Sequence, residues 1–190
     1  MKKLKNNAGF SLIELLCALL ILVILVMAIG VGMDTGTKLY FDATFEAESA
    51  TLAGILNTSI GDILRFSSVT MTENITNVPE GFDKTAVPYV FTSVDYGIQH
   101  AYFYTPVYED GTSKGVLQLK NMKNDKVVEL VNTGAYPNLV VSDFNITYSP
   151  PSGSGVQGGY FEISYQITSE LDSSRTRMVE TIVRAMNDNT

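Results

Sequence analysis

A single uncharged stretch near the start of the chain limits what this protein can fold into more than any other feature. No charged residue occurs from Leu15 to Met33, and most side chains there are large and apolar. A helix of this length extends about 28 Å, which matches the ~30 Å hydrocarbon core of a bilayer. A helix at the surface of a soluble domain would carry a polar stripe, and this stretch has none. We therefore predict a membrane-spanning helix.

The charges that flank this stretch predict its orientation. Lys2, Lys3 and Lys5 precede it, and no acidic residue comes before Glu14. Positively charged flanks remain on the cytoplasmic side of a membrane. We therefore expect a cytoplasmic N-terminus and expect the chain after Met33 to lie outside.

A secretory signal peptide is the alternative interpretation of the same stretch. Its apolar region is typically about 7–15 residues long and ends at a cleavage site of the form small-x-small. The stretch here is longer, and its far end, Met27–Met33, offers only weak candidates for such a site. The pattern therefore favours a retained helix.

One carboxylate interrupts the beginning of the apolar region. Glu14 lies between Leu12-Ile13 and Leu15-Leu16. A carboxylate inside a membrane costs a few kcal/mol near the centre and less near the edge, and it usually has a partner. The lysines lie upstream, so we expect no partner on the same helix. The isolated carboxylate indicates a compensating charge from another molecule.

The residues around Glu14 resemble the signature of type IV prepilins. The sequence Gly9-Phe10-Ser11-Leu12-Ile13-Glu14 follows a short lysine-rich leader and precedes the long apolar helix. The family includes type IV pilins and the pseudopilins of type II secretion and competence systems. The resemblance covers about the first 33 residues.

The resemblance implies cleavage by a membrane prepilin peptidase between Gly9 and Phe10, followed by N-methylation of Phe10. It also implies that Glu14 pairs with the N-terminal amine of a neighbouring subunit during assembly. Such a pair is strong only at good geometry in a low dielectric, so it would set the register of packed helices. The alternative is an uncleaved anchor whose Glu14 reaches the membrane interface.

Composition excludes several other functions. The chain has 20 acidic and 13 basic residues, a net charge of −7, and therefore we expect no binding of nucleic acid. With only Cys17 and His100, it can form neither an intrachain disulfide nor a zinc site of cysteines or several histidines. Glu109–Ser113 lacks the ligand pattern of a calcium loop and predicts a plain hairpin. We predict no enzyme activity and no cofactor.

A second helical pattern follows the membrane segment. Between Lys38 and Phe66 apolar residues recur mainly at four-residue spacing, which predicts one long helix whose second half packs on a sheet. The expected stripe comprises Phe41, Phe45, Leu52, Leu56, Ile60 and Leu64, with Ile55 and Ile63 beside it. Because glycine weakens helices, we expect a bend or local melting at Gly30, Gly32 and Gly36.

Beyond residue 67 the periodicity changes towards two, which is typical of strands. Short turn sequences separate the strands, and this arrangement favours an antiparallel meander. The predicted strands are Pro88–Val94, Ile98–Thr105, Gly115–Asn121, Lys126–Val131, Leu139–Tyr148, Tyr160–Thr168 and Thr176–Met186. The predicted fold class is α+β, with a long N-terminal helix packed on an antiparallel sheet.

The sequence therefore predicts four segments, and the resemblance implies a structural subunit, a minor pilin or pseudopilin, of a type IV pilus-like filament. The segments are a leader (1–9), a transmembrane and filament-core helix (10–33), an amphipathic helix (34–66) and a β-sheet headgroup (67–190). The expected partners are other pilin or pseudopilin subunits, the prepilin peptidase, an inner-membrane assembly platform, and membrane lipid before assembly. The expected location is the inner membrane, then an extracellular pilus or a periplasmic pseudopilus.

Two alternatives stay open at this point. The chain could be a pseudopilin of a type II secretion or competence system. It could also be a single-pass, membrane-anchored binding or adhesion domain that does not polymerise.

Overall fold

The computed structural model describes residues 11–76, 79–80, 82–93, 97–150 and 159–185. The chain divides into two compact units, Met1–Thr44 and Phe45–Thr190. The fold is α+β, with one long helix and an antiparallel arrangement of all strands, as the sequence predicts.

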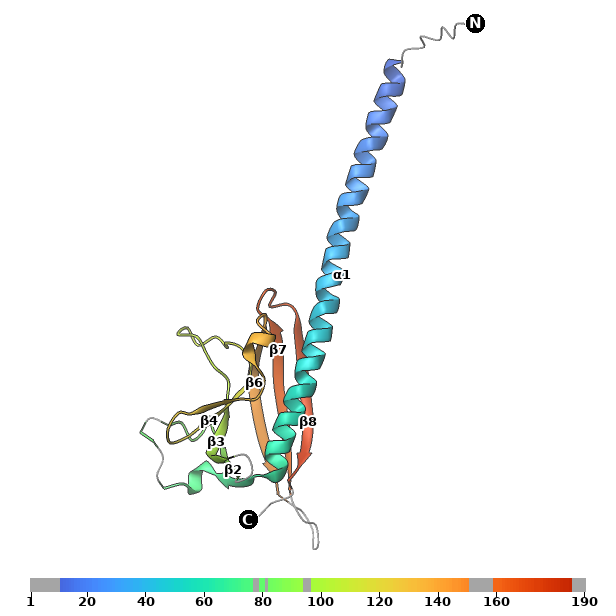
Figure 1. The fold of residues 1–190 in the computed structure, drawn as a ribbon. Helices are drawn as coiled ribbons and strands as arrows, with labels where there is room; N and C mark the ends of the chain where they lie inside the picture. Colours follow the sequence, from blue (N-terminus) through green and yellow to red (C-terminus); the bar gives the residue numbers. More distant parts are fainter. Residues whose placement is uncertain (1–10, 77–78, 81, 94–96, 151–158, 186–190) are drawn as a thin grey trace, which may run out of the picture. The chain divides into compact units, whose positions relative to one another are not determined.

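The helix α1 spans Leu12–Phe66 without a break (Figure 1). The local melting expected at Gly30, Gly32 and Gly36 is absent. A glycine costs a helix only about 1 kcal/mol, and a long cooperative helix tolerates it. Just beyond these glycines, the ammonium of Lys38 forms an ion pair with Asp34 at 2.9 Å, one turn apart.

The C-terminal part of α1 supplies one side of the hydrophobic core. The predicted stripe is confirmed there, since four of its residues are fully buried and Phe45 is partly buried against the core; the four are Leu52, Leu56, Ile60 and Leu64. Ile63 is also buried, whereas Ile55 is 39% exposed and Phe41, in the first unit, is 46% exposed. At about 100° per residue, Ile55 lies well away from the centre of the buried stripe, so its prediction as a core residue was wrong.

The strands form two antiparallel sheets, and in each sheet consecutive strands are neighbours. The first sheet contains β1 (Ser68–Met71), β2 (Tyr89–Ser93), β3 (Ile98–Tyr104), β4 (Gln118–Asn121) and β5 (Val127–Glu129). The second contains β6 (Leu139–Ser149), β7 (Tyr160–Ser169) and β8 (Thr176–Arg184). Two short 3-10 helices, Thr72–Asn74 and Thr133–Ala135, lie in the connections.

All seven predicted strands occur, with ends that differ by up to three residues. Strand β1 was not predicted, because it is only four residues long and follows the helix without a turn sequence. The sequential order confirms the predicted meander. The meander is split into two sheets, because β5 is the last strand of the first sheet and β6 is the first strand of the second.

A bulge in β6 keeps its apolar residues on the core side. Leu139 and Val141 face the core before the bulge, and Ile146 and Tyr148 pack against the core after it. The pairing with β7 shifts between Ser142 and Asn145, where Asp143 adopts a positive φ of 51°. The extra residue reverses the alternation once, so both halves of the strand present their apolar side chains inward.

Polar contacts join α1 to the second sheet. The fully buried Tyr165 of β7 donates its hydroxyl to the side-chain oxygen of Asn57, at 2.9 Å, and lies 3.3 Å from the carbonyl of Ala53. Burial raises the pKa of Tyr165 above its usual value. At the other end of the contact, Arg177 of β8 pairs with Glu46. Figure 1 shows this part of α1 running alongside β7 and β8.

Candidate assembly site at the start of the helix

The first turn of α1 is closed by a reciprocal pair of hydrogen bonds. The backbone N–H of Ser11 donates to Oε2 of Glu14 at 2.8 Å, and the backbone N–H of Glu14 lies 3.3 Å from the hydroxyl oxygen of Ser11. Ser11 directly precedes the helix, and its carbonyl accepts the first helical bond, from Leu15. This arrangement is a capping box, which satisfies backbone donors that a helix start leaves unpaired.

The expectation that Glu14 lacks a partner on its own helix was therefore wrong. A serine followed three residues later by a glutamate, just before an apolar run, is the sequence signature of a capping box. That signal is readable in Ser11-Leu12-Ile13-Glu14, but the partner it provides is a backbone N–H and not a charged group. Gly9 and Phe10, the residues of the predicted cleavage site, lie outside the described residues.

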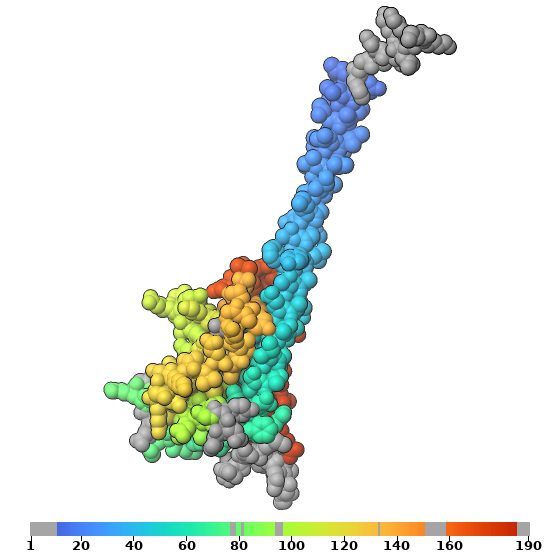
Figure 2. All heavy atoms as spheres, in the orientation of Figure 1, coloured from blue at the N-terminus to red at the C-terminus, as the bar shows by residue number. Residues whose placement is uncertain are grey.

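The segment that follows Glu14 exposes nearly all of its apolar surface. The large apolar side chains between Leu15 and Met33 are 53–70% exposed. Cys17, in the same segment, is an exposed free cysteine. Figure 2 draws the side chains of this part of α1 in blue. It is long and apolar enough to cross a membrane.

The other positions considered from the sequence have ordinary structural roles. His100 lies in β3, where its backbone N–H donates to the hydroxyl oxygen of Thr92 at 3.2 Å. Glu109–Ser113 forms the predicted hairpin, because Val107 bridges to Ser113. Hydrogen bonds from Thr112 hold the pKa of Asp110 below its usual value. Within the described residues, no three histidine, cysteine or acidic side chains gather where they could hold a metal.

Residues 4–30 match the model of the prokaryotic N-terminal methylation motif. The chain carries the signature of type IV prepilins and pseudopilins. No curated protein and no solved structure matches the chain significantly. The motif supports a pilin-like or pseudopilin subunit, whose family is structural rather than enzymatic, and it implies other pilin subunits and processing by a prepilin peptidase. Together with the exposed apolar helix, it fits a membrane-anchored protein.

Proposed function

We propose that this chain is a minor pilin or pseudopilin that prepilin peptidase cleaves between Gly9 and Phe10 and that is then N-methylated at Phe10. The observation that carries the proposal is the position of the methylation motif, at the start of an apolar helix whose side chains no described residue covers between Leu15 and Met33. Such a surface requires lipid or other apolar helices around it.

The predicted segments give each part of the chain a role in this proposal. Residues 1–9 are removed, and their lysines first hold the N-terminus in the cytoplasm. Residues 10–33 lie in lipid before assembly and in the filament core afterwards. Residues 34–66 connect this helix to the headgroup, 67–190, which lies outside the membrane. An inner-membrane platform moves the subunit from lipid into the filament.

In this proposal Glu14 gains a second partner on assembly. Its Oε2 accepts from the neutral backbone N–H of Ser11, and among the described residues its Oε1 has no hydrogen-bond partner. Cleavage creates a positively charged amine at Phe10 of each subunit. Hydrogen bonds between charged groups are roughly twice as strong as those between neutral groups. The amine of a neighbouring subunit can therefore pair with Glu14 at Oε1, or replace Ser11 at Oε2.

The first experiment measures the intact mass and the N-terminal residue of the protein recovered from its native membrane. We expect a chain that begins at N-methylphenylalanine, Phe10. A chain that still begins at Met1 or Lys2, in cells with an active prepilin peptidase, would contradict the proposal. It would leave a membrane-anchored binding domain that does not polymerise.

Two matched variants separate the charge of Glu14 from its capping role. Glu14→Gln keeps an acceptor for the N–H of Ser11 but removes the negative charge. Ser11→Ala keeps the charge but removes the hydroxyl that caps Glu14. We expect Glu14→Gln to be processed normally and to be lost from filaments, and Ser11→Ala to assemble. Equal assembly of both variants and the wild type would show that the charge has no role.

A further inference from the structure

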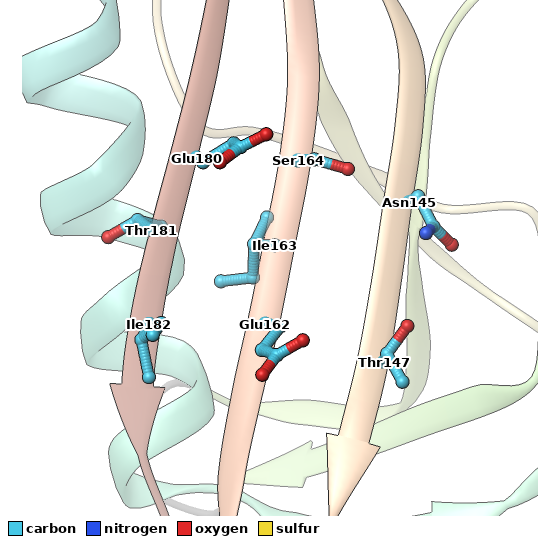
Figure 3. A pocket seen from close by; sticks show the side chains of 8 residues that line it. All are labelled: Asn145, Thr147, Glu162, Ile163, Ser164, Glu180, Thr181 and Ile182. Atoms are coloured by element: carbon cyan, nitrogen blue, oxygen red, sulfur yellow. The ribbon is translucent and has the colours of Figure 1, made fainter.

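The outer face of the second sheet forms an open trough. Alternation places Tyr165 and Val183 towards α1, and it places Glu162 and Ser164 of β7 and Glu180 of β8 on the opposite face. Figure 3 shows two neighbouring rows of side chains across the sheet, which are Glu180, Ser164 and Asn145, then Ile182, Glu162 and Thr147. The trough has a volume of about 680 Å³.

Two carboxylates give this trough a negative charge. Glu162 pairs across the strands with Ile182, and Ser164 pairs with Glu180, so the two glutamates are diagonal neighbours. Both are exposed, and among the described residues neither carboxylate has a hydrogen bond or an ion pair. Like charges at this separation repel each other, and a cation placed between them would relieve that repulsion.

The same face also exposes apolar surface. Met178 and Ile182, which alternate with Glu180 along β8, are 66% and 69% exposed. Strand β8 is at the edge of its sheet. Natural proteins usually protect such edges, because an exposed apolar edge invites association. The combination of negative charge and exposed apolar side chains therefore indicates a contact surface.

A complementary surface lies on the hairpin that joins β4 and β5. Lys123 and Lys126 are exposed there, and among the described residues neither forms an ion pair. Val127 and Val128 follow them and are 42% and 44% exposed. This hairpin therefore offers lysine side chains of opposite charge to the glutamates of the trough, together with exposed apolar side chains of its own.

The hairpin is held in a defined conformation. Its turn is closed by side-chain hydrogen bonds, in which Oδ1 of Asn121 accepts from the N–H of Lys123 at 2.8 Å. Lys120 also pairs with Asp125 across the turn at 3.2 Å. A preorganised hairpin loses little conformational entropy on binding.

The charge balance leaves few basic side chains for a contact between copies, and both lysines of the hairpin are among them. Residues 45–190 contain 9 basic and 17 acidic residues, a formal charge of −8, so neighbouring copies would repel each other without specific contacts. Six of the nine basic side chains make a described contact within the chain or have another interaction of their own. Among the described residues, only Arg65, Lys123 and Lys126 make none.

We propose that the trough on β6–β8 binds the β4–β5 hairpin of a second copy of this chain. This inference rests on the proposed function and adds the identity of the neighbour. The two surfaces lie on different sheets of the same unit, so the contact is head-to-tail. A head-to-tail contact that does not close into a ring produces an open helical filament. At least two copies of this chain are then neighbours in the filament.

Reversing the charges tests this contact in the full-length chain, in cells that process it. One double variant reverses the trough, Glu162→Lys/Glu180→Lys, and the other reverses the hairpin, Lys123→Glu/Lys126→Glu. We expect each of them to reduce the amount of this chain recovered in filaments at least tenfold. The chain with all four changes restores the opposite charges and is expected to recover most of the loss. Two matched controls change exposed residues elsewhere, Glu73→Lys/Glu109→Lys and Arg65→Glu/Lys84→Glu, and we expect both to assemble normally.

A cysteine pair tests the identity of the neighbour. With Cys17 replaced by serine, Ser164→Cys and Asn124→Cys in one chain are expected to produce a ladder of disulfide-linked copies on oxidation. Disulfide linkage to a different subunit would overturn the assignment of a second copy. Thermal unfolding of each variant checks that it is folded.

The two proposals fail in different ways. Normal processing and assembly of both charge-reversal variants would overturn the contact and leave the proposed function intact. An unprocessed wild-type chain would overturn the proposed function itself. Both double variants could also lose assembly while the chain with all four changes fails to recover it. That result would overturn the contact as well, because only a direct contact between the two surfaces predicts the recovery.

Discussion

The two parts of α1 have the same secondary structure and opposite surroundings. Between Leu15 and Met33 the large apolar side chains are 53–70% exposed. In the second unit, Leu52, Leu56, Ile60 and Leu64 are fully buried against the sheets. The first part has apolar residues on every side, whereas the second buries the apolar residues of one stripe and has mainly polar residues elsewhere. The helix itself therefore does not determine what covers each part.

This comparison explains why substitutions in the two parts of α1 are expected to affect different properties, unfolding in one part and membrane insertion in the other. The buried stripe stabilises a core that forms within one chain. The exposed segment gains its stability only from surroundings that another molecule supplies, either lipid or a second helix. A substitution in one part should leave the property of the other unchanged, and two substitutions test this separation directly.

The largest expected effect is on the stability of the second unit. Leu56→Ala removes a fully buried side chain. Substitutions of this kind typically cost about 2–5 kcal/mol, because they remove buried apolar atoms and leave a cavity. Denaturant unfolding of the full chain in detergent micelles measures the loss. Membrane insertion should be unchanged, and a failure of this variant to insert would contradict the separation of the two parts.

The matching change in the first part is Val23→Arg, near the middle of the apolar segment. An arginine at the centre of a membrane helix costs about 2.5–3.5 kcal/mol on insertion scales. We expect a large fall in the fraction of the chain that resists extraction from membranes by alkaline carbonate. Unfolding of the second unit should be unaffected. A Val23→Arg chain that stays fully embedded would show that this segment does not span the membrane.

Much of the fold could be predicted from the sequence because the periodicities are strong. The four-residue spacing of Leu52, Leu56, Ile60 and Leu64 identified the buried face correctly, and strict alternation identified β7. Ile55 was predicted to lie beside the buried stripe, as Ile63 does, but its position on the helix leaves its side chain 39% exposed. Strand β1 and the division into two sheets depend on long-range pairing, which local patterns do not contain.

The candidate site was predictable in part. The motif around Glu14 was readable from residue types and spacing, and the family comparison matches the same region. The hydrogen bonds between Ser11 and Glu14 follow from their three-residue spacing, although the prediction considered only charged partners for Glu14. In contrast, the trough depends on which residues β6, β7 and β8 bring together. No pattern within one strand shows that Glu162 and Glu180 are neighbours.

A smaller effect is expected where α1 is joined to β7. Tyr165→Phe removes the hydroxyl that bonds to Asn57 at 2.9 Å, and the partly buried amide oxygen then loses its donor. We expect a loss of about 1 kcal/mol in the free energy of unfolding. An unchanged stability would show that water replaces the hydroxyl at no cost.

The buried hydroxyl of Tyr165 should also make the stability of the fold depend on alkaline pH. Burial raises the pKa of Tyr165, so the folded chain keeps this proton where the unfolded chain, with an ordinary tyrosine pKa of about 10, has released it. The unfolded state then binds fewer protons, and stability falls as the pH rises through about 10. We expect Tyr165→Phe to flatten this fall in unfolding experiments between pH 8 and pH 11. An identical slope in both chains would contradict the assignment.

The smallest effect is expected next to Leu56 on the same helix. Ile55 is 39% exposed, so Ile55→Ala removes apolar atoms that are already partly in contact with water. Surface changes of this kind usually alter stability by no more than about 0.5 kcal/mol. Measuring the free energy of unfolding of Ile55→Ala and of Leu56→Ala therefore compares two adjacent aliphatic residues that differ in burial. Equal losses would show that Ile55 is covered within the chain, and they would remove the distinction between buried stripe and exposed face on which the comparison of the two parts of α1 depends.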